Sequence, residues 1–147
     1  MFGPAVRRLR ARARERRRHT SLTGAWSGAY GYSLPFQADV PFLAALSEAD
    51  GVLSGSIDEP NTFAPATVEQ LFATLSGSRA GSAVSFVKTY DGAAGVSHSV
   101  SYEGEVNETL TRIDGTWRIS WLSKGPFFME RAVAAEDEAE REAEAGA

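Results

Sequence analysis

The sequence contains no cysteine and only two histidines among its 147 residues. The lack of cysteine excludes disulfides and thiolate metal sites. No second histidine and no carboxylate pair lies at ligand spacing from His98, so we expect no zinc site and predict no cofactor. No apolar run approaches the roughly 18 residues that span a bilayer. The N-terminus also lacks the apolar stretch of a secretory signal, so we expect no membrane span and a cytoplasmic location.

Charge is distributed unevenly along the chain. Residues 1–19 carry eight arginines and one glutamate, whereas residues 132–147 carry six acidic side chains and one arginine. Highly charged segments with few apolar residues cannot bury a face and stay disordered. We therefore predict a disordered basic arm (1–19), one folded domain (20–131) and an acidic Ala/Glu-rich tail (132–147) that is at most a marginal helix.

The basic arm has three interpretations. It could bind nucleic acid or an anionic membrane through counterion release. It could pair with the acidic tail, an attraction that salt screens. We favour the third, an extension without a folded role. The domain carries six basic and twelve acidic side chains, so nucleic-acid binding by the domain itself is not expected.

The domain reads as a series of short alternating segments separated by turn residues, with no convincing amphipathic helix. Such a pattern is typical of an antiparallel sandwich or barrel. Glycine-rich separators such as Asp50-Gly51 and Asp114-Gly115 suggest tight hairpins. Residues 67–75 could also form a short helix, and we assign them to a strand. We predict eight or nine strands near 23–33, 38–48, 52–59, 68–76, 83–90, 96–106, 109–113, 116–123 and 127–131.

The first strand opens with Gly24-Ala25-Trp26, and the last ends at Arg131. With the meander between them, these residues resemble the calycin group, which comprises lipocalins, fatty-acid-binding proteins and avidins. More broadly, the chain is similar to bacterial proteins with such barrels. The resemblance implies one antiparallel up-and-down β-barrel of about eight strands. It also implies that Gly24, Trp26 and Arg131 close one end, with the guanidinium over the indole. No ligand can be carried over from it.

Four aromatic side chains could line a cavity in such a barrel: Tyr30, Tyr32, Tyr102 and Trp121. Rings with a few hydroxyl groups commonly make a small-molecule pocket. A small eight-stranded barrel can equally be filled by its own side chains, and the sequence leaves both alternatives open.

Lys88 and His98 are the remaining candidates. An inward Lys88 could meet a ligand carboxylate, although a position at the rim or on the outer face is favoured. Alternation with Val96, Val100 and Tyr102 points His98 into the barrel. There it could ligate haem iron or act as a general base, but a hydrogen-bonded structural histidine is the commoner case.

These patterns favour non-catalytic binding of a small, largely apolar ligand inside the barrel. The first alternative is an interaction or assembly module with a solid core. It would form a homo-oligomer through outward apolar residues such as Leu43, Val87 and Leu122. A small enzyme that uses His98 ranks third, so we expect no catalytic activity.

Overall fold

The structure is a computed structural model that describes residues 19–33, 37–64, 68–120 and 123–132. The predicted arm up to residue 18, the tail from residue 133, Trp121 and Leu122 lie outside these described residues. Among the described residues, no helix is long and apolar enough to cross a membrane.

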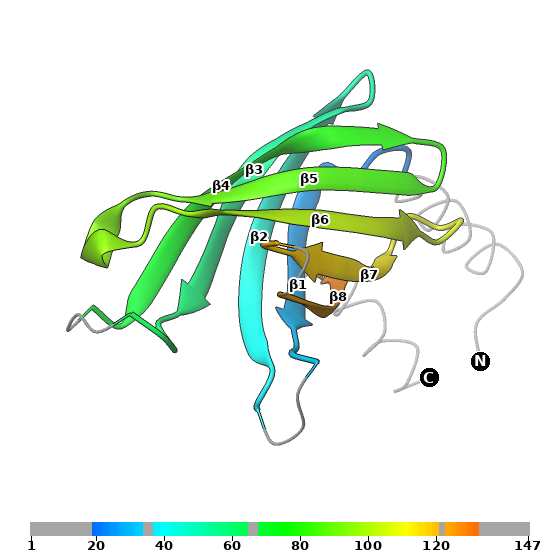
Figure 1. Ribbon diagram of the computed structural model, residues 1–147. Coiled ribbons are helices and arrows are strands. Elements are labelled where there is room, and N and C mark those ends of the chain that lie inside the picture. The colour runs from blue at the N-terminus through cyan, green and yellow to red at the C-terminus, as the bar shows by residue number, and fades with distance from the viewer. Residues whose placement is uncertain (1–18, 34–36, 65–67, 121–122, 133–147) are drawn as a thin grey trace, which may run out of the picture.

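Eight antiparallel strands pair in sequence order and close into a barrel (Figure 1). Each strand pairs with the next along the chain, and β1 pairs with β8 to complete the circle. The predicted all-β, up-and-down architecture is therefore confirmed. The strands are β1 (Gly24–Tyr30), β2 (Val40–Ala49), β3 (Val52–Pro60), β4 (Gln70–Ala80), β5 (Ala83–Tyr90), β6 (Ser99–Val106), β7 (Arg112–Arg118) and β8 (Lys124–Arg131). A short 3₁₀ helix, η1 (Ala93–Gly95), lies between β5 and β6.

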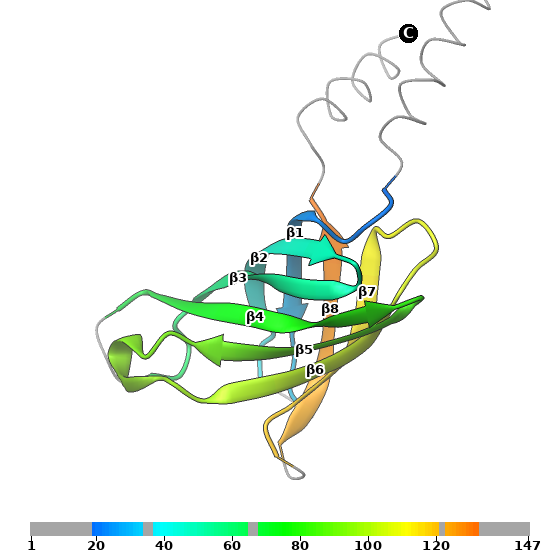
Figure 2. The same cartoon turned by 90° about the horizontal axis from the view of Figure 1, so that it is seen from above.

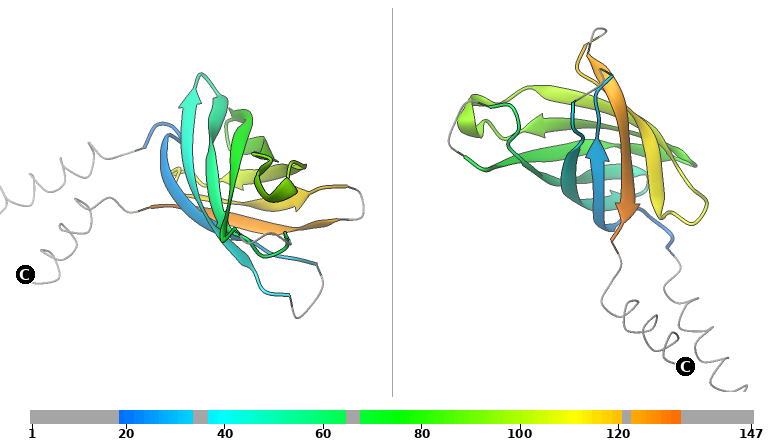
Figure 3. Two further views of the ribbon diagram at one scale, coloured as in Figure 1. Left: turned by 90° about the vertical axis from the view of Figure 1, so that its left-hand side faces the viewer. Right: turned by 90° about the horizontal axis from the view of Figure 1, so that it is seen from below.

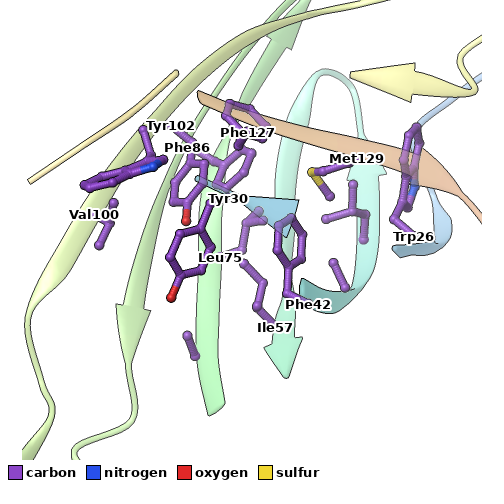
Figure 4. Close-up of a cluster of buried hydrophobic side chains, with 14 of the residues drawn as sticks. Trp26, Tyr30, Phe42, Ile57, Leu75, Phe86, Val100, Tyr102, Phe127 and Met129 are labelled. Carbon is purple, nitrogen blue, oxygen red and sulfur yellow. The ribbon is translucent and has the colours of Figure 1, made fainter. Parts of the chain in front are cut away.

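Strict alternation along the strands separates the interior of the barrel from its outer face. In β2, Val40, Phe42, Ala44 and Leu46 are buried, whereas Pro41, Leu43 and Ala45 are exposed. This pattern follows from the two-residue repeat of a strand, which sends successive side chains to opposite faces. The buried residues form one core that runs through the barrel (Figure 4).

The two ends of the barrel differ. The tight β2–β3, β4–β5 and β6–β7 connections lie at one end, next to the start of β1 and the end of β8. Figures 2 and 3 show both terminal strands leaving the barrel at that end. We call it the closed end. The longer connections after β1, β3, β5 and β7 lie at the opposite end, which we call the open end.

One predicted turn is wrong and changes the strand count from nine to eight. Asp114-Gly115 lies inside β7, and the preceding turn falls at residues 107–111 instead. Gly115 faces Gly104 of β6, and a β-carbon added at Gly115 would lie 2.5 Å from the Gly104 Cα atom. This glycine therefore marks a close approach of two strands rather than a turn.

The actual turn is held by an asparagine. The Asn107 side-chain oxygen accepts hydrogen bonds from the backbone N–H groups of Thr111 (2.8 Å) and Arg112 (3.0 Å). Leu110 adopts a positive φ of 57°. Residues 124–126, also read as a separator, belong to β8.

Candidate functional site

An aromatic cavity of about 200 Å³ lies at the open end of the barrel. Its lining comes from β1, β5, β6 and β7 and from the connections at that end. Aromatic rings make up most of the wall, with two aliphatic side chains completing it. The lining residues are Tyr30, Tyr32, Phe63, Tyr90, His98, Val100, Tyr102, Trp117 and Ile119.

Behind the cavity wall, Glu59 of β3 and Lys88 of β5 form an ion pair. Both residues are 1% exposed, and the Lys88 ammonium donates to the Glu59 carboxylate. They are the two buried charged residues of the described chain. The predicted preference for a rim or outward Lys88 is therefore corrected. Val84, Phe86, Lys88 and Tyr90 alternate inward along β5.

Two tyrosines complete the coordination of the Glu59 carboxylate. The Tyr30 hydroxyl donates to one carboxylate oxygen at 2.5 Å, and the Tyr90 hydroxyl donates to the other at 2.9 Å. The carboxylate thus accepts hydrogen bonds from three donors. A buried carboxylate needs such partners, because an unpaired one would carry a large desolvation cost.

The Lys88 ammonium is also enclosed by ring faces. It lies 4.8 Å from the Tyr30 ring centroid, 4.7 Å from that of Tyr90 and 5.9 Å from that of Tyr102. A ring face attracts a cation through its quadrupole. All three rings also line the cavity, so they lie between the ion pair and the interior of the cavity.

Burial shifts the titration of these groups in different directions. It lowers the pKa of Lys88, and the negative charge of Glu59 opposes that shift. Burial, the hydrogen bond to Glu59 and its charge raise the pKa of Tyr30 far above the ordinary tyrosine value. The pKa of Tyr90 rises for the same reasons. At neutral pH the two phenols are therefore protonated and serve as donors.

Tyr102 brings to the cavity a hydroxyl that no described residue uses. Its ring stacks on Phe86 at a centroid distance of 4.8 Å and meets the edge of Phe127 at 4.9 Å. Tyr102 is 2% exposed, and its hydroxyl makes no hydrogen bond to any described residue. No fully buried side-chain polar atom of the described residues lacks a partner. The Tyr102 oxygen must therefore be reachable from the cavity that its residue lines.

Trp117 and Tyr32 form a second part of the wall. Their rings meet edge to face at 5.8 Å, and each ring meets Tyr30 in the same way, at 6.2 Å and 6.1 Å. The Trp117 indole N–H donates to the Gly31 carbonyl at 2.6 Å. Its only donor is thereby occupied, so Trp117 contributes an apolar surface.

The mouth of the cavity is formed by Phe63, His98 and Ile119, all of which are exposed. The His98 ring lies 4.9 Å from the Tyr90 ring and 5.9 Å from the Phe63 ring. His98 precedes β6 and is exposed at the rim instead of buried in the interior. At the open end of the barrel, a side chain on the inward face of a strand is still exposed to solvent, as His98 is.

The structure thus brings five of the six predicted ligand-binding residues to the open end. Tyr30, Tyr32, His98 and Tyr102 line the cavity, and Lys88 lies behind its wall. The sixth, Trp121, is outside the described residues. Glu59 and the cavity residues Phe63, Tyr90 and Trp117 were not among the predicted ligand-binding residues. Alternation with Leu53 and Ile57 along β3 could have pointed Glu59 inward.

At the closed end, Gly24, Trp26 and Arg131 lie together as the resemblance implied. The Arg131 guanidinium stacks 4.8 Å from the Trp26 ring centroid. It also donates to the carbonyls of Leu110 (3.0 Å), Thr23 (2.7 Å) and Ser21 (2.7 Å). Gly24 has a φ of 143°, and a β-carbon there would lie 2.8 Å from the guanidinium. Figure 4 shows Trp26 at the far side of the core from Tyr102 and Val100.

No group of three or more His, Cys, Asp or Glu side chains within the described ranges is arranged to hold a metal ion. The described cavity wall presents rings, the Tyr32 and Tyr102 hydroxyls and an imidazole, a set suited to holding a small molecule.

No protein-family model and no curated protein matches the sequence. Among solved structures, the chain is similar to a mutant of the fluorescent protein UnaG. The two share 14% sequence identity at a TM-score of 0.40, over 76% of this chain and 96% of that one. A likeness this distant carries no information about a ligand, and the barrel fold rests on the strand pairing itself.

Proposed function

We propose that the protein binds a small, largely apolar molecule in the aromatic cavity, without chemical conversion. The observation that carries this proposal is the cavity itself, about 200 Å³ of space walled mainly by aromatic rings. An apolar cavity of ~150 Å³ is large enough to take up benzene, whereas drug-sized ligands occupy about 300–1,000 Å³. The site therefore suits a compact ligand of one or two rings.

The proposed contacts follow from the wall. Tyr30, Tyr32 and Trp117 supply ring surfaces, and Tyr102 supplies a hydroxyl. The ligand enters at the open end, where the exposed side chains of Phe63 and His98 flank the cavity. Catalysis is not part of the proposal, because Glu59, Lys88 and the two tyrosines that donate to Glu59 are already committed to one another.

A cavity-filling variant tests this function. Val100 is 5% exposed and lines the cavity, so Val100→Phe would occupy part of the space. Val87 is 43% exposed on the outer face of the neighbouring strand, so Val87→Phe is the matched control. Both variants and the wild type would be purified gently from their host and compared by native mass spectrometry.

We expect a small-molecule adduct on the wild type and on Val87→Phe, and its loss from folded Val100→Phe. The mass of the adduct would identify the ligand. An adduct retained by folded Val100→Phe would contradict binding in this cavity. A bare mass for all three proteins, together with failure of the wild type to bind added naphthalene, would contradict the function itself.

The assembly alternative depends on the outer face. Leu43 of β2 is 62% exposed and Phe72 of β4 is 51% exposed. Both residues pair with Asp58 of β3 in the register, so this acidic side chain lies between the two apolar ones. A carboxylate in the middle of the patch opposes burial against an apolar partner, and we therefore rank assembly below ligand binding.

A further inference from the structure

We infer that the ligand is electrically neutral and flat, and that it carries one polar group that pairs with the Tyr102 hydroxyl. This inference rests on the proposed function and specifies the class of ligand. It differs from the alternative that the sequence left open, in which an inward Lys88 meets a ligand carboxylate.

The buried charges behind the cavity wall disfavour an anionic ligand. Lys88 and Glu59 carry opposite charges, and both are buried behind the rings that wall the cavity. The Lys88 ammonium already donates to Glu59. A ligand carboxylate would have to compete with Glu59 for the ammonium while being repelled by it. An anion that enters a low-dielectric site without a free cation loses its hydration and gains no countercharge.

Two of the tyrosine hydroxyls at the cavity are not available to an anion. The hydroxyls of Tyr30 and Tyr90 both donate to Glu59, so their protons are committed. Trp117 donates its N–H to Gly31. Among the described lining residues with buried side chains, the Tyr102 hydroxyl is the polar group left for a ligand.

The rings of the cavity wall favour a flat ligand. The rings of Tyr30, Tyr32 and Trp117 meet at interplanar angles of 70°, 75° and 82°. Perpendicular rings present both a face, on which another ring can stack, and an edge, which can meet the face of another ring. A flat ligand can contact one face and meet the edge of the next ring, whereas a flexible chain would lose rotational freedom in the same space.

The test is a matched pair of probes with one shape and different charge. At pH 7, 2-naphthamide is neutral and 2-naphthoate is an anion, and naphthalene lacks the polar group. Titrations of the full chain would follow calorimetric heat. We expect 2-naphthamide to bind about tenfold or more tighter than 2-naphthoate.

Three results would separate the claims. Equal or tighter binding of 2-naphthoate would overturn the inference and leave the proposed function intact. The same holds if naphthalene binds but neither 2-naphthamide nor 2-naphthoate does. If none of the three compounds binds, the proposed function itself fails.

Two variants examine the residues that carry the inference. Tyr102→Phe removes only the hydroxyl, so it should weaken 2-naphthamide about two- to tenfold and leave naphthalene unchanged. An unchanged affinity for 2-naphthamide would contradict the role of Tyr102. Glu59→Gln removes the countercharge of Lys88 and should shift the preference toward 2-naphthoate.

Glu59→Gln could fail to fold, because it leaves a buried ammonium without a countercharge. The double variant Glu59→Gln/Lys88→Met restores neutrality with similar volumes. It should keep the preference for 2-naphthamide. A reversed preference in this double variant would contradict the argument from charge.

Discussion

Glu59 and Lys88 lie 29 residues apart in the sequence and form an ion pair inside the barrel, where both side chains are at most 1% exposed. The pair fixes the electrostatic character of the open end. It also holds Tyr30 and Tyr90 in place, because both hydroxyls donate to the same carboxylate. Its two charges cancel, so the cavity in front of it has no free cation.

Removing one partner of the ion pair should lower the free energy of unfolding far more than replacing both partners by neutral residues. Lys88→Met leaves the Glu59 carboxylate buried with only its two tyrosine donors, and we expect a loss of about 3–5 kcal/mol in the free energy of unfolding. Glu59→Gln/Lys88→Met should recover most of that loss. Urea denaturation followed by circular dichroism measures both.

The control for this prediction is Arg112→Met on the barrel surface. Arg112 pairs with Asp114 and Glu130, and all three side chains are 42–62% exposed. We expect its unfolding midpoint to stay close to that of the wild type. A Lys88→Met variant as stable as Arg112→Met would contradict the importance of the buried pair.

The free energy of unfolding should fall steeply at alkaline pH. Burial raises the pKa of Tyr30, Tyr90 and Tyr102 in the folded protein. Above pH ~10 the unfolded chain releases these protons while the folded chain keeps them, so each tyrosine removes ~1.4 kcal/mol of stability per pH unit. Lys88 acts in the opposite sense, because its folded pKa is lowered, but three tyrosines outweigh one lysine.

Tyr102→Phe checks the alkaline prediction. This variant removes one tyrosine and leaves the Glu59 network intact, so the slope of stability against pH between about 10 and 11.5 should become shallower. Urea unfolding at several pH values gives the slope. An identical slope in wild type and variant would show that Tyr102 does not retain its proton in the folded state.

Arg131 should be essential at the closed end. Arg131→Ala removes the stacking on Trp26 and the hydrogen bonds to three carbonyls. We expect a loss of about 3 kcal/mol and a shift of tryptophan emission to longer wavelength. Arg131→Lys should rescue only part of the stability, because an ammonium cannot reproduce the planar fork. Full rescue by lysine would indicate that charge alone suffices.

Gly115 gives a test of the strand pairing. Gly115→Ala places a methyl group against the backbone of β6, 2.5 Å from the Gly104 Cα atom, so we expect a loss of several kcal/mol or a failure to fold. Gly81→Ala is the control, since a β-carbon at Gly81 meets no atom within 4 Å and the cost comes only from its φ of 59°. Equal effects would contradict the close approach of β6 and β7. Thermal unfolding measures both.

The sequence was sufficient to predict the barrel because each strand alternates by itself. Val40, Phe42 and Leu46 show the inward face of β2 without any knowledge of its partners. Asp114-Gly115 was misread because a glycine at a close approach and a glycine in a turn look the same in one sequence. Only the register with Gly104 distinguishes the two.

The candidate site was predictable only in part. Tyr30, Tyr32 and Tyr102 follow from alternation and ring chemistry. The role of Glu59 depends on a partner two strands away, and the neutrality of the cavity depends on that pairing. Phe63 lies in a connection outside any strand pattern. Long-range contacts of this kind leave no local signal in the chain.

The central claim is that a small flat molecule occupies the space beside Val100 and Tyr102. Nuclear magnetic resonance of methyl-labelled protein with 2-naphthamide tests it most directly. We predict intermolecular Overhauser effects from the ligand protons to the Val100 methyl groups and none to those of Val87 on the outer face. Effects to Leu43 and Val87 with none to Val100 would contradict binding inside the barrel.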